Sequence, residues 1–181
     1  MAITSVSETL KHIKNVRKFL YKVIKQLEEQ GKVHDTSKLE SPELEIFDEY
    51  TPKLRNTTYG SDEYKQYLKE MQVALDHHYA NNRHHPEHFS MIFKCEDCGE
   101  LYAYRPAECK TCAHTDCFVR ICSVDKMNLV DIIEMFCDWK AATLRHGDGD
   151  IMKSIEINAK RFNMSDELKQ ILINTVEILE K

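Results

Sequence analysis

The feature that most constrains this fold is a set of four cysteines arranged as two C-x-x-C pairs. They are Cys95, Cys98, Cys109 and Cys112. A C-x-x-C pair on one tight turn lets two thiolates reach the same ion, and tetrahedral Zn²⁺ takes four such ligands. Residues 101–104 and 118–121 are typical of short strands. Residues 92–122 are therefore predicted to form a small β zinc ribbon, in which Cys117 or His114 could replace one ligand.

The remainder of the chain has the composition and periodicity of a helical protein. Only 5 glycines and 4 prolines occur among 181 residues, and the 42% hydrophobic content is enough to bury a core. Apolar residues recur at helical spacing in residues 5–31, 43–50, 61–79 and 128–144, and twice more after residue 150. We therefore expect an all-α fold in which residues 1–91 and 123–181 form one helical domain and residues 92–122 are an insert.

Charge and patterning exclude several classes of protein. The net charge of -5 does not favour a general polyanion binder, and acidic side chains balance the basic ones in the predicted ribbon, so nucleic acid is not expected as a partner. No run approaches about 18 apolar residues, and the N-terminus lacks the pattern of a signal peptide. We expect a cytoplasmic protein without membrane contact, in which clustered cysteines bind metal instead of forming disulfides.

A second group of candidate metal ligands centres on the doublet His34-Asp35, which Lys38 follows. Adjacent His and Asp side chains can reach one ion only at the end or bend of a helix, and they need partners from elsewhere in the chain. His12 lies upstream at the edge of an apolar stripe, and five histidines lie within residues 77–88. Asp131, Glu134 and Asp138 share one face of a later helix.

Several assignments stay open at this point. His78 continues a buried helical stripe and His77 points away, but the sequence does not decide which of His77, His78, His84, His85 and His88 are ligands. The histidine-rich run could also be a solvated loop. Asp131 could serve the N-terminus of its helix, and Glu134 and Asp138 could form a solvated stripe. Either Asp131 or Asp138 could be the last ligand.

The order of these residues resembles the H…HD…D pattern of the HD-domain metal-dependent phosphohydrolase superfamily. The resemblance implies an HD-like helical bundle in which His12, His34, Asp35 and Asp138 hold a divalent ion. Lys38 matches the lysine of the family's His-Asp-x-Gly-Lys motif, although Ser37 replaces the glycine. The Gly-Tyr-Pro motif of the phosphodiesterase branch is absent. The chain also resembles small bacterial and phage proteins that share its His-His-Pro-Glu-His and Glu-Met-x-x-Asp-Trp runs.

The expected activity is hydrolysis of a nucleotide or other small phosphate ester. One or two ions of Mn, Fe, Co or Zn would activate water, Lys38 would neutralise phosphate charge, and Glu43 would orient water. His78 with His84 or His85 would bind a second ion or stabilise the leaving oxygen. Two alternatives are a di-iron oxygenase of the same superfamily, and a zinc-ribbon module that binds nucleic acid or protein beside a degenerate site. The ribbon could also gate the site or join two copies into a homo-oligomer.

Overall fold

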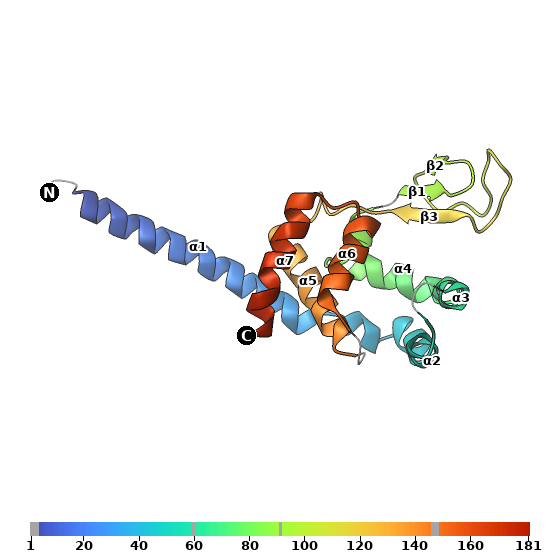
Figure 1. Cartoon of the computed structure of the whole chain (residues 1–181), viewed down its shortest axis with the longest axis horizontal. Helices are drawn as coiled ribbons and strands as arrows, with labels where there is room; N and C mark the ends of the chain where they lie inside the picture. Colours follow the sequence, from blue (N-terminus) through green and yellow to red (C-terminus); the bar gives the residue numbers. More distant parts are fainter. Residues whose placement is uncertain (1–3, 59–60, 91, 146–148) are drawn as a thin grey trace. The chain divides into compact units, whose positions relative to one another are not determined.

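The computed structural model describes residues 4–58, 61–90, 92–145 and 149–181. These residues form seven α-helices, two 3₁₀ helices and one small sheet of three strands (Figure 1). The expectation of a mainly helical fold with a small β insert is thus confirmed. The chain divides into two compact units, Met1–His34 and Asp35–Lys181.

The first unit is a single helix, α1, which runs from Ser5 to Val33. Thr4 is its N-cap, and the side chains of Thr4 and Ser7 each bond the backbone of the other in a capping box. Gly31 does not end the helix, which continues for two more residues to its C-cap at His34. Because α1 is one unbroken helix, the number of residues between His12 and His34 determines the distance between them.

The second unit begins with a 3₁₀ turn and three helices. They are η1 (Thr36–Leu39), α2 (Glu43–Arg55), α3 (Asp62–Glu70) and α4 (Gln72–Asn81). The sequence predicts one helix over residues 61–79, but the helix breaks at Met71, whose side chain is fully buried. The break lets α3 and α4 take different directions, and both α2 and η1 pack against α4.

A short 3₁₀ helix, η2 (Pro86–Phe89), follows α4 and leads into the ribbon. The ribbon sheet has the order β2-β1-β3 and is antiparallel throughout. Its strands are β1 (Ile92–Cys95), β2 (Leu101–Tyr102) and β3 (Phe118–Ile121). Two of the three lie where the sequence predicts strands. The central strand β1, which carries the first ligand cysteine, was not predicted.

The chain ends in three helices that enclose an apolar core. They are α5 (Leu129–Thr143), α6 (Ile151–Arg161) and α7 (Asp166–Glu180). One residue of α5, two of α6 and two of α7 form the buried cluster: Phe136, Ile151, Ile155, Leu172 and Val176. Burial of each large apolar side chain contributes about 1.5–3 kcal/mol. None of the described helices combines the length and apolar content that crossing a bilayer requires.

Candidate functional site

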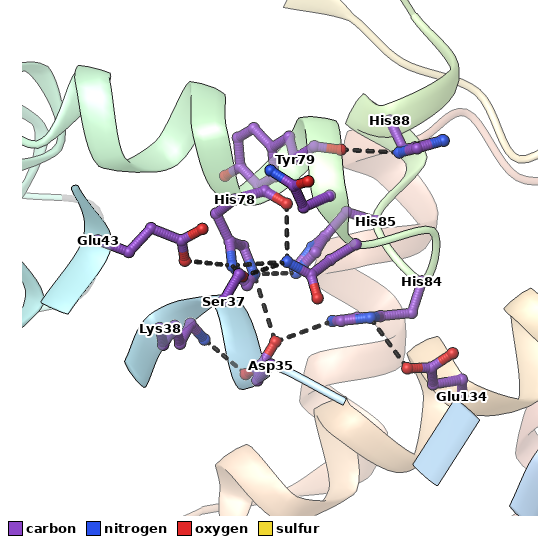
Figure 2. Close-up of polar contacts among 12 residues, drawn as sticks. Asp35, Ser37, Lys38, Glu43, His78, Tyr79, His84, His85, His88 and Glu134 are labelled. Atoms are coloured by element: carbon purple, nitrogen blue, oxygen red, sulfur yellow. Dashed lines mark hydrogen bonds and ion pairs between the residues drawn. The ribbon is translucent and has the colours of Figure 1, made fainter. Parts of the chain in front are cut away.

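Four side chains of the second unit bring potential metal ligands together. Asp35, His78, His84 and His85 each present one ligand atom, and these four atoms lie within 4.8 Å of one another. Figure 2 shows Asp35 reaching toward the three imidazoles from the side opposite α4. Four residues that the sequence singles out, from three different segments, therefore meet at one point.

The distances between the ligand atoms match the edges of a metal coordination shell. The Nε2 atoms of His78 and His84 both lie 3.4 Å from Asp35 Oδ1. The Nε2 atoms of His78 and His85 are 2.9 Å apart. Ligands about 2.1 Å from a central ion are separated by roughly 3.0–3.4 Å in octahedral or tetrahedral geometry. The side chains are therefore spaced as one divalent ion would hold them.

Local backbone structure aims these side chains. Asp35 adopts a left-handed conformation with φ of 56°, which aspartate tolerates better than most residues, and it immediately precedes η1. His78 lies in the last turn of α4. His84 and His85 fall between the end of α4 and Pro86, whose fixed φ starts η2. The predicted polar loop is thus largely an interior segment, since His84, Pro86 and Glu87 are buried.

A buried carboxylate orients His78. The Oε2 atom of Glu43 lies 2.8 Å from His78 Nδ1, and its Oε1 atom lies 2.7 Å from His77 Nδ1. Because a carboxylate only accepts hydrogen bonds, Nδ1 of His78 carries the proton and Nε2 presents its lone pair to the cluster. Both oxygens of Glu43 face imidazoles, so Glu43 orients the candidate ligand His78, while its predicted role in orienting water stays a prediction.

Glu134 orients His84 in the same way from a different helix. Its Oε1 atom on α5 lies 3.2 Å from His84 Nδ1, while His84 Nε2 faces Asp35. Carboxylates that hold the far nitrogen of a ligating histidine fix its tautomer and raise its basicity. Glu43 and Glu134 therefore place two of the three histidines in the protonation state that metal binding needs.

The electrostatics of the cluster favour neutral imidazoles. Burial, reinforced by His84 and His78, lowers the pKa of His85 to about 2. Burial also lowers the pKa of His78, and the nearby Lys38 ammonium acts in the same direction. Lys38 Nζ lies 2.6 Å from Asp35 Oδ2, which leaves Oδ1 of the same carboxylate toward the histidines. One carboxylate thus bridges the lysine and the ligand cluster.

The structure does not bring His12 and His34 together. Both belong to the first unit, where His34 is the C-cap of α1 and His12 lies in its second turn. At 1.5 Å per residue the helix separates them by about 30 Å, which no pair of side chains can span to one ion. The prediction that His12 and His34 hold the same ion is therefore wrong.

The two candidate aspartates of α5 have different surroundings. Asp131 is fully buried, accepts the Asn128 backbone N–H in a capping box at 3.0 Å, and receives two hydrogen bonds from Arg83. Its predicted alternative role at the helix N-terminus is confirmed. A carboxylate oxygen of Asp138 lies within 4.8 Å of one of Asp35. Asp138, not Asp131, therefore adjoins the cluster.

The remaining histidines of the run lie outside the four-ligand group. The side chain of His77 is 41% exposed against 2% for His78, which confirms the predicted inward role of His78. His88 directs Nδ1 to the Tyr79 carbonyl oxygen at 2.9 Å. Asn82, which the sequence analysis did not single out, bonds Ser37 Oγ and the His78 carbonyl oxygen, both at 2.8 Å. Its position four residues after His78 was the available signal.

The predicted ribbon ligands also meet. The Sγ atoms of Cys95, Cys98, Cys109 and Cys112 lie within 4.8 Å of one another, and all are free thiols. Each C-x-x-C pair closes the same turn, with Gly99 N–H bonding Cys95 O at 2.9 Å and Ala113 N–H bonding Cys109 O at 2.8 Å. Gly99 and Ala113 both have positive φ, as this turn requires. The cysteine cluster can therefore hold a metal ion.

Two further side chains adjoin the ribbon thiols. A hydrogen bond from Tyr102 Oη, 3.3 Å from Cys109 Sγ, lowers the pKa of Cys109 to about 6. Cys117 Sγ lies 3.4 Å from Cys95 Sγ and joins Asp97 and Cys112 in an overlapping ligand group. Cys117 is thus placed to substitute for a ligand, whereas His114 pairs with Asp97.

Comparison with known proteins yields one family. A model described as "Family of unknown function (DUF5662)" matches residues 1–178. No curated protein and no solved structure matches the chain.

Proposed function

The chain belongs to the DUF5662 family, whose function is unknown, and we propose that it is a metal-dependent phosphohydrolase acting on a nucleotide or other small phosphate ester. The observation that carries this proposal is the convergence of Asp35 with His78, His84 and His85 beside the Lys38 ammonium. A site with three imidazoles, one carboxylate and an adjacent cation combines a metal ligand set with a group that attracts phosphate.

The ligand set suits a divalent transition metal. Three neutral imidazoles and one carboxylate accommodate Mn²⁺, Fe²⁺, Co²⁺ or Zn²⁺, and mixed nitrogen and oxygen ligation does not choose sharply among them. A bound divalent ion would lower the pKa of a coordinated water and offset the charge that develops on a phosphoryl group. Asp138 also presents a carboxylate oxygen within 4.8 Å of one of Asp35, which adds a further oxygen donor beside the cluster.

Lys38 is the residue of the site best suited to contact substrate phosphate. Its side chain is 30% exposed, while its ammonium lies 2.6 Å from a carboxylate that is only 17% exposed. The ammonium also lies 5.2 Å from the centre of the Phe47 ring, which limits the directions the chain can take. Because Lys38 is partly exposed, its ammonium can contact a phosphate oxygen while it keeps its ion pair with Asp35.

We further propose that the helical part is HD-like with an altered ligand set. The His-Asp doublet, the following lysine and a late aspartate keep the order of the HD pattern. His12 does not fill the first position, because α1 extends it far from the doublet. His78 in the last turn of α4 and His84 after it provide imidazoles close to Asp35 instead.

The second metal of the proposal is structural zinc in the ribbon. Four thiolates with C-x-x-C spacing at both knuckles are the preferred donor set for a closed tetrahedral zinc site. The ribbon has little apolar core of its own beyond Tyr102 and Phe118, which pack against the cysteines. Metal binding would therefore supply much of the folding free energy of this segment.

The proposal is tested by metal content and phosphatase activity of the same preparations. Wild type, Asp35→Asn and the control Asp48→Asn, an exposed aspartate on α2, are compared by elemental analysis and by a screen across nucleotides. We expect Asp35→Asn to lose one metal equivalent and the activity, and Asp48→Asn to retain both. Equal phosphatase activity in Asp35→Asn would exclude the proposed centre. Iron-dependent oxygen consumption without phosphate release would instead identify an oxygenase.

A further inference from the structure

A cleft of about 390 Å³ lies between the helical part of the second unit and the ribbon. Residues from α3, α4, η2, β1, β3 and the end of α6 line it. In Figure 1 the ribbon strands are drawn above α4 and α3. Tyr79 of α4 lines the cleft, and it directly follows the candidate ligand His78. The cleft and the candidate metal site therefore lie on different faces of α4.

Part of the cleft lining is apolar and largely aromatic. It includes the buried side chains of Phe93 from β1 and Phe162 after α6, together with Leu68, Leu75, Tyr79, Phe118 and Val119. Burial, together with the Glu87 carboxylate, raises the pKa of Tyr79 to about 12, so its ring stays neutral. Such a lining fits the flat apolar part of a small molecule.

The charged side chains that line the cleft are mostly basic although the chain as a whole is acidic. Five basic side chains line the cleft against three carboxylates, in a protein with a net charge of -5. The basic residues are Lys65, Lys69, Arg105, Arg120 and Arg161, and the acidic ones are Glu87, Glu96 and Asp116. The charged residues that line the cleft therefore carry a net positive charge, whereas the whole chain carries a net negative charge.

Two of the arginines are engaged within the protein. Arg161 Nη2 lies 2.6 Å from Oε1 of the buried Glu87, and Arg120 Nη2 lies 2.7 Å from Asp76 Oδ1. The Arg120 guanidinium also lies 5.1 Å from the centre of the Phe93 ring. These ion pairs hold the walls of the cleft in place.

Lys69 and Arg105 differ from Arg161 and Arg120 in their partners. Across the described parts of the chain, neither forms an ion pair with a carboxylate. Arg105 donates from Nη1 to Gln72 Oε1 at 2.6 Å, a neutral acceptor that fixes the guanidinium without offsetting its charge. The two cations come from α3 and from the ribbon and line the same cleft. Arg105, fixed by a neutral acceptor, and the exposed Lys69 therefore add positive charge beside apolar lining, which favours an anionic ligand.

We infer that this cleft binds a small organic anion in which a phosphate or phosphonate group is joined to a flat apolar body. Arg105 and Lys69 bind the anionic group, and the rings of Tyr79 and Phe93 contact the apolar body. A guanidinium matches the geometry of such oxyanions through paired N–H donors. This site is separate from the proposed metal centre and goes beyond the proposed function.

Phenylphosphonate is a suitable probe because its carbon–phosphorus bond is not a phosphate ester. The full-length chain, ¹⁵N-labelled and loaded with zinc, is titrated while amide shifts are followed by NMR. We expect saturable shifts at Phe93, Arg105 and Arg120. The double variant Lys69→Ala/Arg105→Ala should weaken binding by about tenfold or more, because it removes the charged hydrogen bonds to the anionic group.

Three controls make the result decisive. Lys153→Ala removes an exposed lysine of α6 that does not line the cleft and should bind as wild type does. Asp35→Asn alters the metal centre and should also leave cleft binding unchanged. Benzamide, which has the ring but no charge, should produce no saturable shift at the cleft.

The inference is overturned if phenylphosphonate shifts only amides near Asp35 and His84, if no shift saturates, or if benzamide binds equally well. It is also overturned if the double variant binds as tightly as wild type. If the double variant does not fold, the single variant Lys69→Ala, at an exposed position, must still weaken binding several-fold.

Discussion

The Glu43 carboxylate and the His78 imidazole form a buried pair in which Oε2 and Nδ1 are 2.8 Å apart. Glu43 is fully buried and His78 is 2% exposed, so water does not compete for this contact. The pair fixes the proton on Nδ1 and leaves Nε2 facing Asp35 and His85. A residue on α2 thereby controls the direction of a ligand on α4.

Replacement of Glu43 by glutamine should weaken metal binding at the centre. The amide keeps the shape of the side chain but removes the charge that raises the basicity of His78, and loss of such a partner typically costs about 10- to 100-fold in metal affinity. Competition with a chromophoric chelator would measure the affinity. Glu45→Gln, an exposed change on the same helix, serves as the control. Equal metal affinity in both variants would show that Glu43 has no part in the centre.

Substitution of the two α5 aspartates, Asp131 and Asp138, should have different effects, one on stability and the other on activity. Asp131→Asn weakens a capping box and a two-bond contact with Arg83, so the free energy of unfolding should fall by about 1–3 kcal/mol with the metal content unchanged. Asp138→Asn should leave stability nearly unchanged and reduce phosphatase activity. Urea unfolding and activity assays on both variants test this difference. The reverse pattern would assign the functional role to Asp131.

Much of the site follows from side-chain chemistry and helical periodicity. The stripe of α4 singles out His78 over His77, and the C-x-x-C spacing identifies the ribbon ligands. Both inferences depend on short-range geometry that the sequence itself determines. The same reasoning gave Asp131 a role at the helix N-terminus as one of two alternatives, and the capping box with Asn128, three positions earlier, selects that alternative.

The long-range relationships could not be predicted in this way. Periodicity did not predict that α1 continues past Gly31 to Val33. The expected helix over residues 5–31 already separates His12 from residue 31 by about 28 Å, so it was the family resemblance, not the periodicity, that placed His12 and His34 at one ion. Nor does periodicity reveal that α2 directs Glu43 to the rings of His77 and His78, a contact across 34 and 35 residues. The break at Met71 depends on tertiary burial, which overrides a local helical pattern.

The ribbon should depend on its four thiols and not on a buried cysteine nearby. Cys98→Ser should abolish stoichiometric zinc in the ribbon, because a hydroxyl is a far weaker zinc ligand than a thiolate. Cys122 is buried, unlike the exposed Cys98, but it lies outside the ligand groups found among the described residues, so Cys122→Ser should keep the zinc. Native mass spectrometry of the two variants measures the difference. Zinc loss in Cys122→Ser alone would contradict the assignment.

Tyr79 should make the protein less stable in alkali. Its pKa, raised by burial from 10.0 to about 12, means that the unfolded chain loses this proton near pH 10 while the native state keeps it. Ionisation then favours the unfolded state between pH 10 and 12, and the free energy of unfolding should fall by at most about 3 kcal/mol from this group. Urea unfolding of wild type and Tyr79→Phe at pH 8, 10 and 11 isolates this contribution, because phenylalanine keeps the ring without the titrating hydroxyl. The stability of wild type relative to Tyr79→Phe should be constant below pH 10 and decline above it. A difference that stays constant to pH 11 would mean that Tyr79 ionises in the native state as readily as in the unfolded chain.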